Sequence, residues 1–163
     1  LKKHGKFKHI SVITAFGNHG RTTDRPRIAT AWSNSYEWLL YQQLSKKYED
    51  DKKMTWLVGK SYLHYLDILG HSVRFHHGDG VKGSAAGAVD KAMAAWDKTE
   101  QAFLDCLGHF HRFCDTGKSV TNGSLMGYNA FAVEIKAAYE PPSQTLVLLT
   151  EAGKHVTWQI QCD

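Results

Sequence analysis

The sequence predicts a mixed α/β domain, and three observations support this prediction. Residues 9–16 are β-branched and apolar without helical periodicity, which is typical of a buried strand. Residues 85–103 are rich in Ala, Lys and Met and place their apolar residues on one face, which favours a helix. Further short strand-like runs fill the last third of the chain. Because no repeat, low-complexity tract or linker divides residues 1–163, we expect one domain.

The first strand and helix are bounded by turn and cap residues. The strand over 9–16 ends at Gly17, and a loop containing Gly, Thr, Asp and Pro follows at 20–27. Asn34 is expected to cap a helix with an apolar stripe that continues to Tyr48.

The middle of the chain predicts three strands before the second helix. Residues 54–58, 62–69 and 72–76 are apolar and β-branched or aromatic, and we expect them to form a meander. After the helix over 85–103, the apolar run at 103–107 predicts another strand.

The C-terminal third is expected to be all strand. The segments are 119–122, 130–135, 145–151 and 155–161. The last two flank an Ala-Gly-Lys turn and predict a hairpin.

Composition excludes several classes of protein. The hydrophobic fraction of 42% and the charged fraction of 22% exclude a disordered chain. A net charge of +4 suits anionic substrates but is too small for a dedicated nucleic-acid binder. Every apolar stretch is much shorter than the about 20 residues that a membrane-spanning helix needs. We therefore expect no membrane partner. The three cysteines do not form a framework of disulfide pairs, so we expect a reducing, cytoplasmic setting.

Histidine is the unusual residue of this chain. Ten histidines occur in 163 residues. Histidine or asparagine follows three predicted strands, beside glycines that let the backbone turn sharply, at 17–20, 76–79 and 108–111. Strand ends are rigid and the adjoining loops leave open coordination positions, so this pattern indicates a metal or acid–base site. Alternation along an extended strand would place both rings of His109 and His111 on one face.

The ordered motifs also carry a resemblance to a known family. They are Gly-Asn-His at 17–19, His-Gly-Asp at 77–79, Gly-His-Phe-His at 108–111 and Asn-Gly-Ser at 122–124. In this order they resemble the third, fourth and fifth motifs of the calcineurin-like metallophosphoesterases, and in detail the phage-encoded metallophosphatase branch. The resemblance covers most of the chain. It implies a sandwich of two packed mixed β-sheets with helices on the outside.

The resemblance implies a two-metal site that hydrolyses a phosphoester. By resemblance, Asn18, His77 and His109 would hold one divalent metal and His111 would help hold the other. His19 would sit beside the scissile phosphate, where it would stabilise the transition state or protonate the leaving oxygen. Imidazole ligands suit manganese, zinc, iron or nickel better than calcium. The Asn-Gly-Ser turn is expected to support the site rather than bind metal.

Three arginines beside His19 have two possible roles. Arg21, Arg25 and Arg27 either bind phosphate oxygens of the substrate or form an ordinary solvated loop. The substrate class also stays open between phosphomonoester, phosphodiester and DNA or nucleotide.

Two family motifs are missing from this chain. It contains no Asp-x-His, and its one Gly-Asp, at 78–79, already belongs to the His77 motif. The acidic residue that follows Gly-Asn-His in the family is Gly20 here, which leaves Asp24 as a candidate to orient His19. We therefore expect the C-terminal part of a longer enzyme or a split-gene product, truncated at the N-terminus of the fold. Alone it would be inactive, and it would associate with itself or with the missing half. The alternative is a non-catalytic metal-binding or interaction module that keeps the fold without a complete site.

Overall fold

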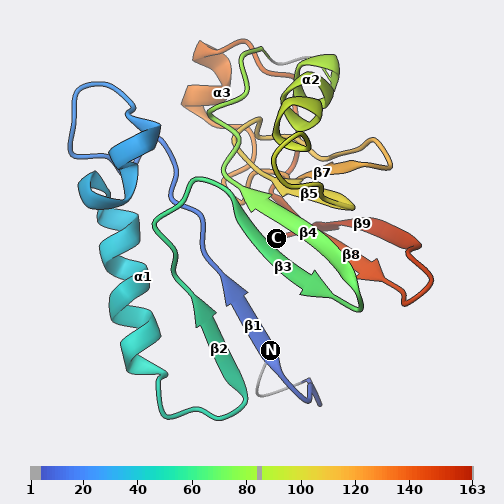
Figure 1. The fold of residues 1–163 in the computed structure, drawn as a ribbon. Coiled ribbons are helices and arrows are strands. Elements are labelled where there is room, and N and C mark those ends of the chain that lie inside the picture. The colour runs from blue at the N-terminus through green and yellow to red at the C-terminus, as the bar shows by residue number, and fades with distance from the viewer. Residues whose placement is uncertain (1–4, 84–85, 163) are drawn as a thin grey trace. The chain divides into compact units, whose positions relative to one another are not determined.

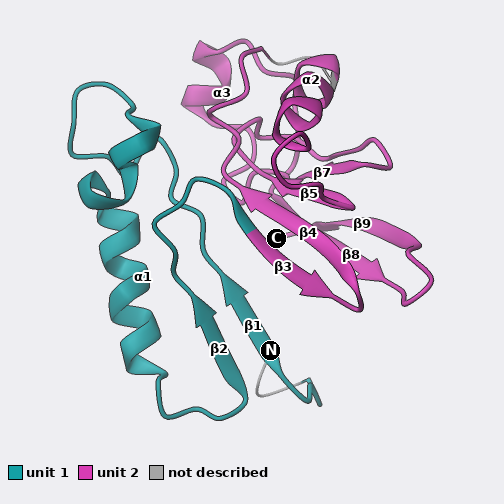
Figure 2. Cartoon of the chain, in the orientation of Figure 1, with its two compact units in different colours: residues 1–64 teal, residues 65–163 magenta. Residues whose placement is uncertain are grey.

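A computed structural model describes residues 5–83 and 86–162 and divides the chain into two compact units, residues 1–64 and 65–163 (Figures 1 and 2). Both units combine helices with strands, so the predicted α/β class is confirmed. Whether the units behave as one domain stays a prediction. No helix within the described residues has the length and apolar character needed to cross a membrane.

The first unit is a strand–helix–strand arrangement. Strands β1 (Ile10–Ile13) and β2 (Met54–Leu57) pair in parallel, with Ile10 opposite Met54. Between them lie a 3-10 helix, η1 (Ile28–Asn34), and helix α1 (Tyr36–Lys47). Ser35, not Asn34, caps α1, because the Ser35 hydroxyl accepts a hydrogen bond from the Trp38 backbone N–H at 3.2 Å while Asn34 ends η1.

The predicted three-strand meander is wrong. Strand β2 pairs with β1 instead, since the crossover through α1 brings it alongside β1 in parallel. Only β3 (His64–Ile68) and β4 (His71–His76) are neighbours in one sheet. Leu69 and Gly70 connect them, both in the left-handed region with φ of 57° and 81°.

The second unit is built on a five-stranded mixed sheet in the order β3-β4-β5-β7-β6. Strands β4, β5 (Leu104–Leu107) and β7 (Ser119–Thr121) run parallel, and the short β6 (Cys114–Asp115) is antiparallel to β7. The predicted C-terminal hairpin is confirmed as β8 (Ser143–Leu149) and β9 (His155–Gln161). The sequence did not predict β6.

Both faces of this sheet are covered within the second unit. On one face, Val89 and Met93 of helix α2 (Ala86–Trp96) pack with Leu107 of β5. On the other face, Val147 and Leu149 of β8 pack against the buried side chains Val73, Leu104 and Val120. The second unit is therefore a layer of helix, a five-stranded sheet and a second two-stranded sheet (Figure 1).

Two predicted elements differ from the structure. The helix predicted to reach residue 103 stops at Trp96, because the next residue, Asp97, turns in to bind the buried Arg74 at 3.0 Å. The strand predicted at 130–135 is a short helix, α3 (Ala130–Glu134). Asn129 caps it by accepting a hydrogen bond from the Ala132 backbone N–H at 3.1 Å, and this local bond outweighs the strand preference of the β-branched residues.

A buried ion pair lies in the sheet beneath α2. The Arg74 and Asp105 side chains have exposed fractions of 0% and 1%, and two hydrogen bonds of 2.7 and 2.9 Å join them. Burial by itself lowers the pKa of Arg74, but hydrogen bonds to Asp105 and Tyr65 outweigh it and raise that pKa above its ordinary value. Trp96 covers the guanidinium with its ring at 5.4 Å. The charge is thus fully compensated inside the unit.

We expect the Cys106 thiol to be unreactive at neutral pH. Burial, with a smaller contribution from the charges of Asp105 and Asp115, raises the pKa of Cys106 to about 12. Alkylation with iodoacetamide at pH 8, followed by mass spectrometry, should label Cys114 and Cys162 well before Cys106. Equal labelling of all three thiols in the folded chain would contradict this packing.

Acid should loosen the attachment of the hairpin through Asp115. Burial raises the pKa of Asp115, but hydrogen bonds from Gly117 and from Thr157 and His155 of β9 outweigh it and lower that pKa. Because the pKa of Asp115 is lower in the folded protein than in the unfolded one, its ionised carboxylate stabilises the fold above about pH 4. This stabilisation is lost as the pH falls through the pKa of the folded state. Urea unfolding between pH 6 and pH 3 should show a loss of at most about 1 kcal/mol from this group. This loss should be absent in Asp115→Asn. A variant that loses as much stability between pH 6 and pH 3 as the wild-type protein would contradict the role given to Asp115.

Candidate metal and phosphate site

The parallel strands of the second unit end at one edge of the sheet, and the predicted motifs follow them there. The Gly108 backbone N–H donates to the His77 carbonyl at 3.0 Å, just beyond the ends of β5 and β4. The imidazole rings of His77 and His109 are neighbours, with their centroids 5.2 Å apart. The Asn122 backbone N–H, after β7, donates to the Leu107 carbonyl at 2.7 Å. Such an edge is where α/β proteins place ligand sites.

Gly78 allows the two histidine loops to approach this closely. Its φ is +112°, a conformation that strongly favours glycine. A Cβ at this position would lie 3.0 Å from the His109 Cβ and 3.1 Å from the Gly108 carbonyl oxygen. Since one neighbour is a backbone atom and the other a Cβ fixed to the backbone, a side chain at 78 would push the His77 and His109 segments apart.

The expectation that His109 and His111 share one face is wrong. Strand β5 ends at Leu107, so alternation does not extend to these residues. Both histidines adopt left-handed backbone conformations, with φ of 68° and 57°. As a result the His109 ring contacts His77, whereas the His111 ring contacts Phe131 of α3 at 5.5 Å.

Asn18 and His19 belong to the first unit, whereas His77, His109 and His111 belong to the second. Asn18 is half-buried and His19 is exposed. Their loop, residues 17–20, packs on the first turn of α1, because the Gly17 N–H donates to the Glu37 carboxylate and the Tyr36 N–H donates to the Gly20 carbonyl at 2.9 Å.

Glu37 is a residue of this loop environment that the sequence did not reveal. A Cβ at Gly20 would lie 2.6 Å from the Glu37 carboxyl carbon, so the absence of a side chain at Gly20 leaves room for that carboxylate. Asp24, the candidate to orient His19, is exposed, and its carbonyl accepts a hydrogen bond from Arg21. Its place in the first turn of α1, two residues after the Ser35 cap, is the only signal that the sequence offers.

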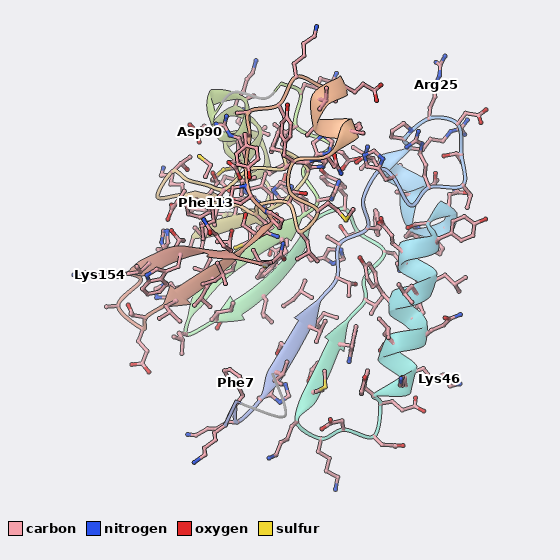
Figure 3. All side chains as sticks on the ribbon, turned by 180° about the vertical axis from the view of Figure 1, so that it is seen from behind. Phe7, Arg25, Lys46, Asp90, Phe113 and Lys154 are labelled. Atoms are coloured by element: carbon pink, nitrogen blue, oxygen red, sulfur yellow. The ribbon has the colours of Figure 1, made fainter. Side chains whose placement is uncertain are left out.

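The three arginines differ in their availability to a substrate. The Arg21 guanidinium donates to the carbonyls of Asn18 and Asp24, so it holds the loop together. Arg25 and Arg27 are exposed, and they line an open hollow within the loop at 22–27. Figure 3 shows Arg25 at the loop tip, pointing away from the ribbon. Arg25 and Arg27 are therefore the two that are free to meet an anion.

The Asn-Gly-Ser turn joins the two sheets of the second unit, and its support of a metal site stays a prediction. The Asn122 side chain donates to Gln144 at 3.2 Å and accepts from the Thr145 backbone N–H at 2.7 Å, which fastens β8 to the end of β7. At Gly123, a Cβ would lie 2.1 Å from the Ser143 hydroxyl oxygen and 3.2 Å from its carbonyl oxygen. Both residues thus serve the packing of the two sheets.

The donors in the second unit suit a first-row divalent cation but are few. His77 and His109 offer two neighbouring imidazoles, which manganese, zinc, iron and nickel accept. Two residues after His77, the Asp79 Oδ1 atom is buried and accepts no hydrogen bond from any described residue. Across residues 5–83 and 86–162, however, no three His, Cys, Asp or Glu side chains converge into a metal-binding group. The donor type fits a metal, and a full shell needs further ligands.

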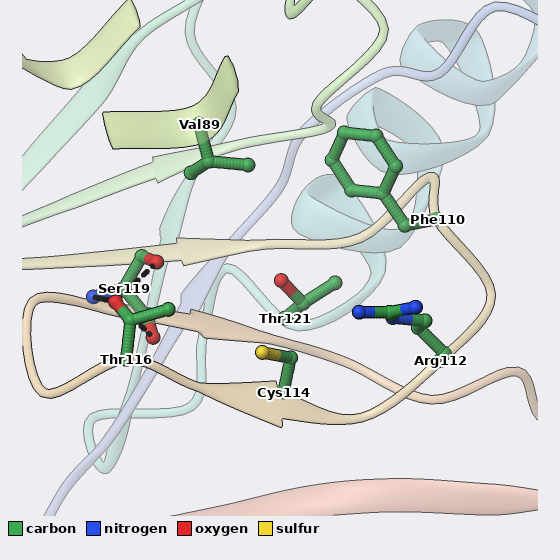
Figure 4. A pocket seen from close by; sticks show the side chains of 7 residues that line it. All are labelled: Val89, Phe110, Arg112, Cys114, Thr116, Ser119 and Thr121. Atoms are coloured by element: carbon green, nitrogen blue, oxygen red, sulfur yellow. Dashed lines mark hydrogen bonds between the residues drawn. The ribbon is translucent and has the colours of Figure 1, made fainter. Parts of the chain in front are cut away.

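A small cavity lies on the side of the sheet that faces α2, and it is not a substrate site. Figure 4 shows the Cys114 thiol and the Arg112 guanidinium beside Thr121 within it, with the Thr116 and Ser119 hydroxyls joined at 2.9 Å. Its volume of about 20 Å³ has room for one water molecule. The cavity is too small to hold a phosphoester.

Comparison with known proteins gives only distant structural similarity. No protein-family model matches the chain, and no curated protein sequence matches it. Among solved structures, zinc-bound wild-type Vps29 from Entamoeba histolytica is 16% identical with a TM-score of 0.45, over 68% of this chain and 66% of that one. Vacuolar protein sorting 29 from Cryptosporidium parvum is 18% identical with a TM-score of 0.42, over 61% of this chain and 56% of that one.

A single mutant of the Entamoeba histolytica protein aligns over more of the chain. It is 12% identical with a TM-score of 0.46, over 94% of this chain and 98% of that one. At these identities and TM-scores, the comparisons assign neither a family nor an activity to this chain.

Proposed function

We propose that this chain contributes to a metal-dependent phosphoester hydrolase, and that His77 and His109 hold a divalent metal. The observation that carries the proposal is the meeting of these two imidazoles at the carboxyl edge of β4 and β5, with ring centroids 5.2 Å apart. When bound, such a metal polarises a phosphoryl oxygen and lowers the pKa of a water molecule.

The chain's other residues have separate roles in this proposal. By the resemblance, Asn18 would add its amide oxygen to the ligand set, and His111 would help to hold a second cation. His19, exposed at the end of the β1 loop, donates a proton to the leaving oxygen. Arg25 and Arg27 bind phosphate oxygens of the substrate, a phosphomonoester, a phosphodiester or a nucleotide. The family resemblance of the motifs supports these roles.

A second candidate is a non-catalytic metal-binding or interaction module. It is favoured by the lack of any group of three His, Cys, Asp or Glu ligands within the described residues. Such a module would bind one metal weakly through His77 and His109 and hydrolyse nothing.

An assay with bis-(p-nitrophenyl) phosphate and Mn²⁺ distinguishes the two candidates. We expect negligible hydrolysis by the 163-residue chain, and metal-dependent hydrolysis once the chain is joined to a polypeptide that supplies Asp-x-His and Gly-Asp motifs. In the joined protein, His19→Ala should lower turnover by about 10²–10⁴-fold while metal content stays intact. Metal bound at His77 and His109 without hydrolysis in the joined protein would favour the non-catalytic module.

A further inference from the structure

The last strand of the second unit, β9, has a reversed pattern of polar and apolar side chains. Its polar side chains point inward: the Thr157 hydroxyl donates to the Asp115 carboxylate at 2.7 Å, and the Gln159 amide donates to the Ser143 hydroxyl at 3.0 Å. Its outward side chains form an apolar row that is 53%, 45% and 47% exposed and consists of Val156, Trp158 and Ile160. Because strands with one solvated face normally expose their polar side, this apolar row calls for a partner on the outer side of β9.

The backbone of β9 also has one edge without a hydrogen-bond partner. The Thr150 N–H donates to the Lys154 carbonyl at 2.9 Å, and the Cys162 N–H donates to the Pro142 carbonyl at 2.8 Å. Hydrogen-bonded pairs alternate along an antiparallel ladder, so these two bonds show that the even-numbered residues of β9 bond to β8. The N–H and C=O groups of the odd-numbered residues, from 155 to 161, therefore point away from β8, and within the part of the chain that the structure describes nothing bonds to them.

The opposite edge of the hairpin, along β8, is already in use. The Thr145 N–H donates to the Asn122 side chain at 2.7 Å, and the Ser143 N–H donates to the Ser124 carbonyl at 2.9 Å. The β9 edge, in contrast, lacks the features that usually block an edge strand. It contains no Pro, Lys, Arg, Asp or Glu, and its pairing with β8 runs over all seven residues without a bulge. Such an edge is a template for another strand.

The sequence of β9 is complementary to itself. In an antiparallel pair of two β9 strands centred on Trp158, this residue lies opposite its own copy and Val156 lies opposite Ile160. The odd-numbered residues then exchange the hydrogen bonds that they lack, and the two apolar rows meet at the non-hydrogen-bonded positions, where opposite side chains lie closest. No Asp, Glu, Lys or Arg is present to bring like charges together. A nucleic acid or an anionic membrane would need basic residues here, and β9 has none.

We propose that the β9 edge pairs with the same edge of a second copy of this chain, so that two hairpins join into one four-stranded antiparallel sheet with a two-fold axis at Trp158. Each apolar row then shields the other, and symmetric dimers of this kind are the commonest oligomers. Because one pair of seven-residue strands is a small interface, we expect a weak dimer. Neither strand of the hairpin carries a proposed metal or phosphate residue, so this dimer is independent of the proposed function.

Sedimentation equilibrium and hydrogen exchange of the 163-residue chain, each from low to high micromolar concentration, test this dimer. We expect the mass to rise towards twice that of one chain. In exchange measurements by NMR, the backbone amides of the odd-numbered residues of β9 should become protected as the dimer forms. The amides of the even-numbered residues should be protected at every concentration, because they bond to β8 within one chain.

Charged substitutions on the outer face test the pairing register. Trp158→Lys should weaken the dimer by about tenfold or more, because two lysines would face each other at the two-fold axis. The matched control is Leu148→Lys, on the same face of β8 and 52% exposed, which should leave the dimer unchanged. Ile160→Lys should also weaken the dimer, and addition of Val156→Glu should restore it through two ion pairs across the axis. This pair of variants gives a second test if Trp158→Lys does not fold.

Two outcomes would overturn the dimer. A chain that stays monomeric at every concentration would do so, and odd-numbered amides protected in that monomer would show that another segment of the chain covers the β9 edge. A dimer that Leu148→Lys weakens as much as Trp158→Lys would also do so, since the outer faces of the hairpins and not their edges would then be in contact.

Discussion

Asp105→Ala is expected to destabilise the protein by about 3–5 kcal/mol, because it would leave the Arg74 guanidinium buried without its main counter-charge. Both side chains are at most 1% exposed, so water cannot replace the lost carboxylate without opening the layer beneath α2. Asp97, the second partner at 3.0 Å, is one-third exposed and compensates only part of the charge. The free energy of unfolding from urea titration measures the loss.

A double substitution serves as the matched control. Arg74→Met with Asp105→Leu removes both charges and keeps an apolar volume between β4 and β5, so most of the lost stability should return. A single Asp105→Ala variant within about 0.5 kcal/mol of the wild-type protein, the range of an ordinary surface change, would show that this pair is not buried as described.

His109→Ala is expected to weaken binding of Mn²⁺ by on the order of 100-fold or more. Even residues that only orient a metal ligand contribute about 10–100-fold to affinity, and the proposed site has few ligands to spare. Calorimetric titration of the 163-residue chain measures the change. This chain should hold at most one metal, since two neutral imidazoles and the single nearby carboxylate of Asp79 carry too little negative charge to offset the repulsion between two close cations.

Two histidine variants control for nonspecific loss. His155→Gln removes a histidine that lies against Asp115 of β6 and against Phe103, which precedes β5, so it lies near the start of β5 and not at its carboxyl end; metal affinity should not change. His111→Ala should leave the first metal in place, because the His111 ring contacts Phe131 and the His109 ring contacts His77. Equal weakening in all three variants would contradict a site at His77 and His109.

The sequence predicted the elements that depend on local apolar runs. The strands at β1, β2, β4 and β5 and the C-terminal hairpin all lie where short β-branched or apolar segments are bounded by turns. It missed the partner of β2, because pairing depends on the crossover through α1 and not on the strand itself. It also missed α3, where the Asn129 cap determines a helix only five residues long.

Part of the candidate site was predictable from the spacing of glycine and histidine. The approach of His77 to His109 follows from two parallel strands that end in glycine-containing turns. The separate orientation of His111 was not predictable, because it depends on left-handed backbone at two non-glycine residues, a conformation that no pattern in the sequence signals. Glu37 was missed for a related reason, since its contact with Gly20 joins residues 17 positions apart.

The central claim is that His77 and His109 together bind one divalent cation, and paramagnetic broadening tests it most directly. In an NMR titration of the 163-residue chain with Mn²⁺, the imidazole signals of His77 and His109 should broaden first and at the same metal concentration. In His109→Ala, the His77 signal should no longer broaden at that concentration. First broadening at other histidines, or uniform broadening of all histidine signals, would contradict a shared metal site at this edge of the sheet.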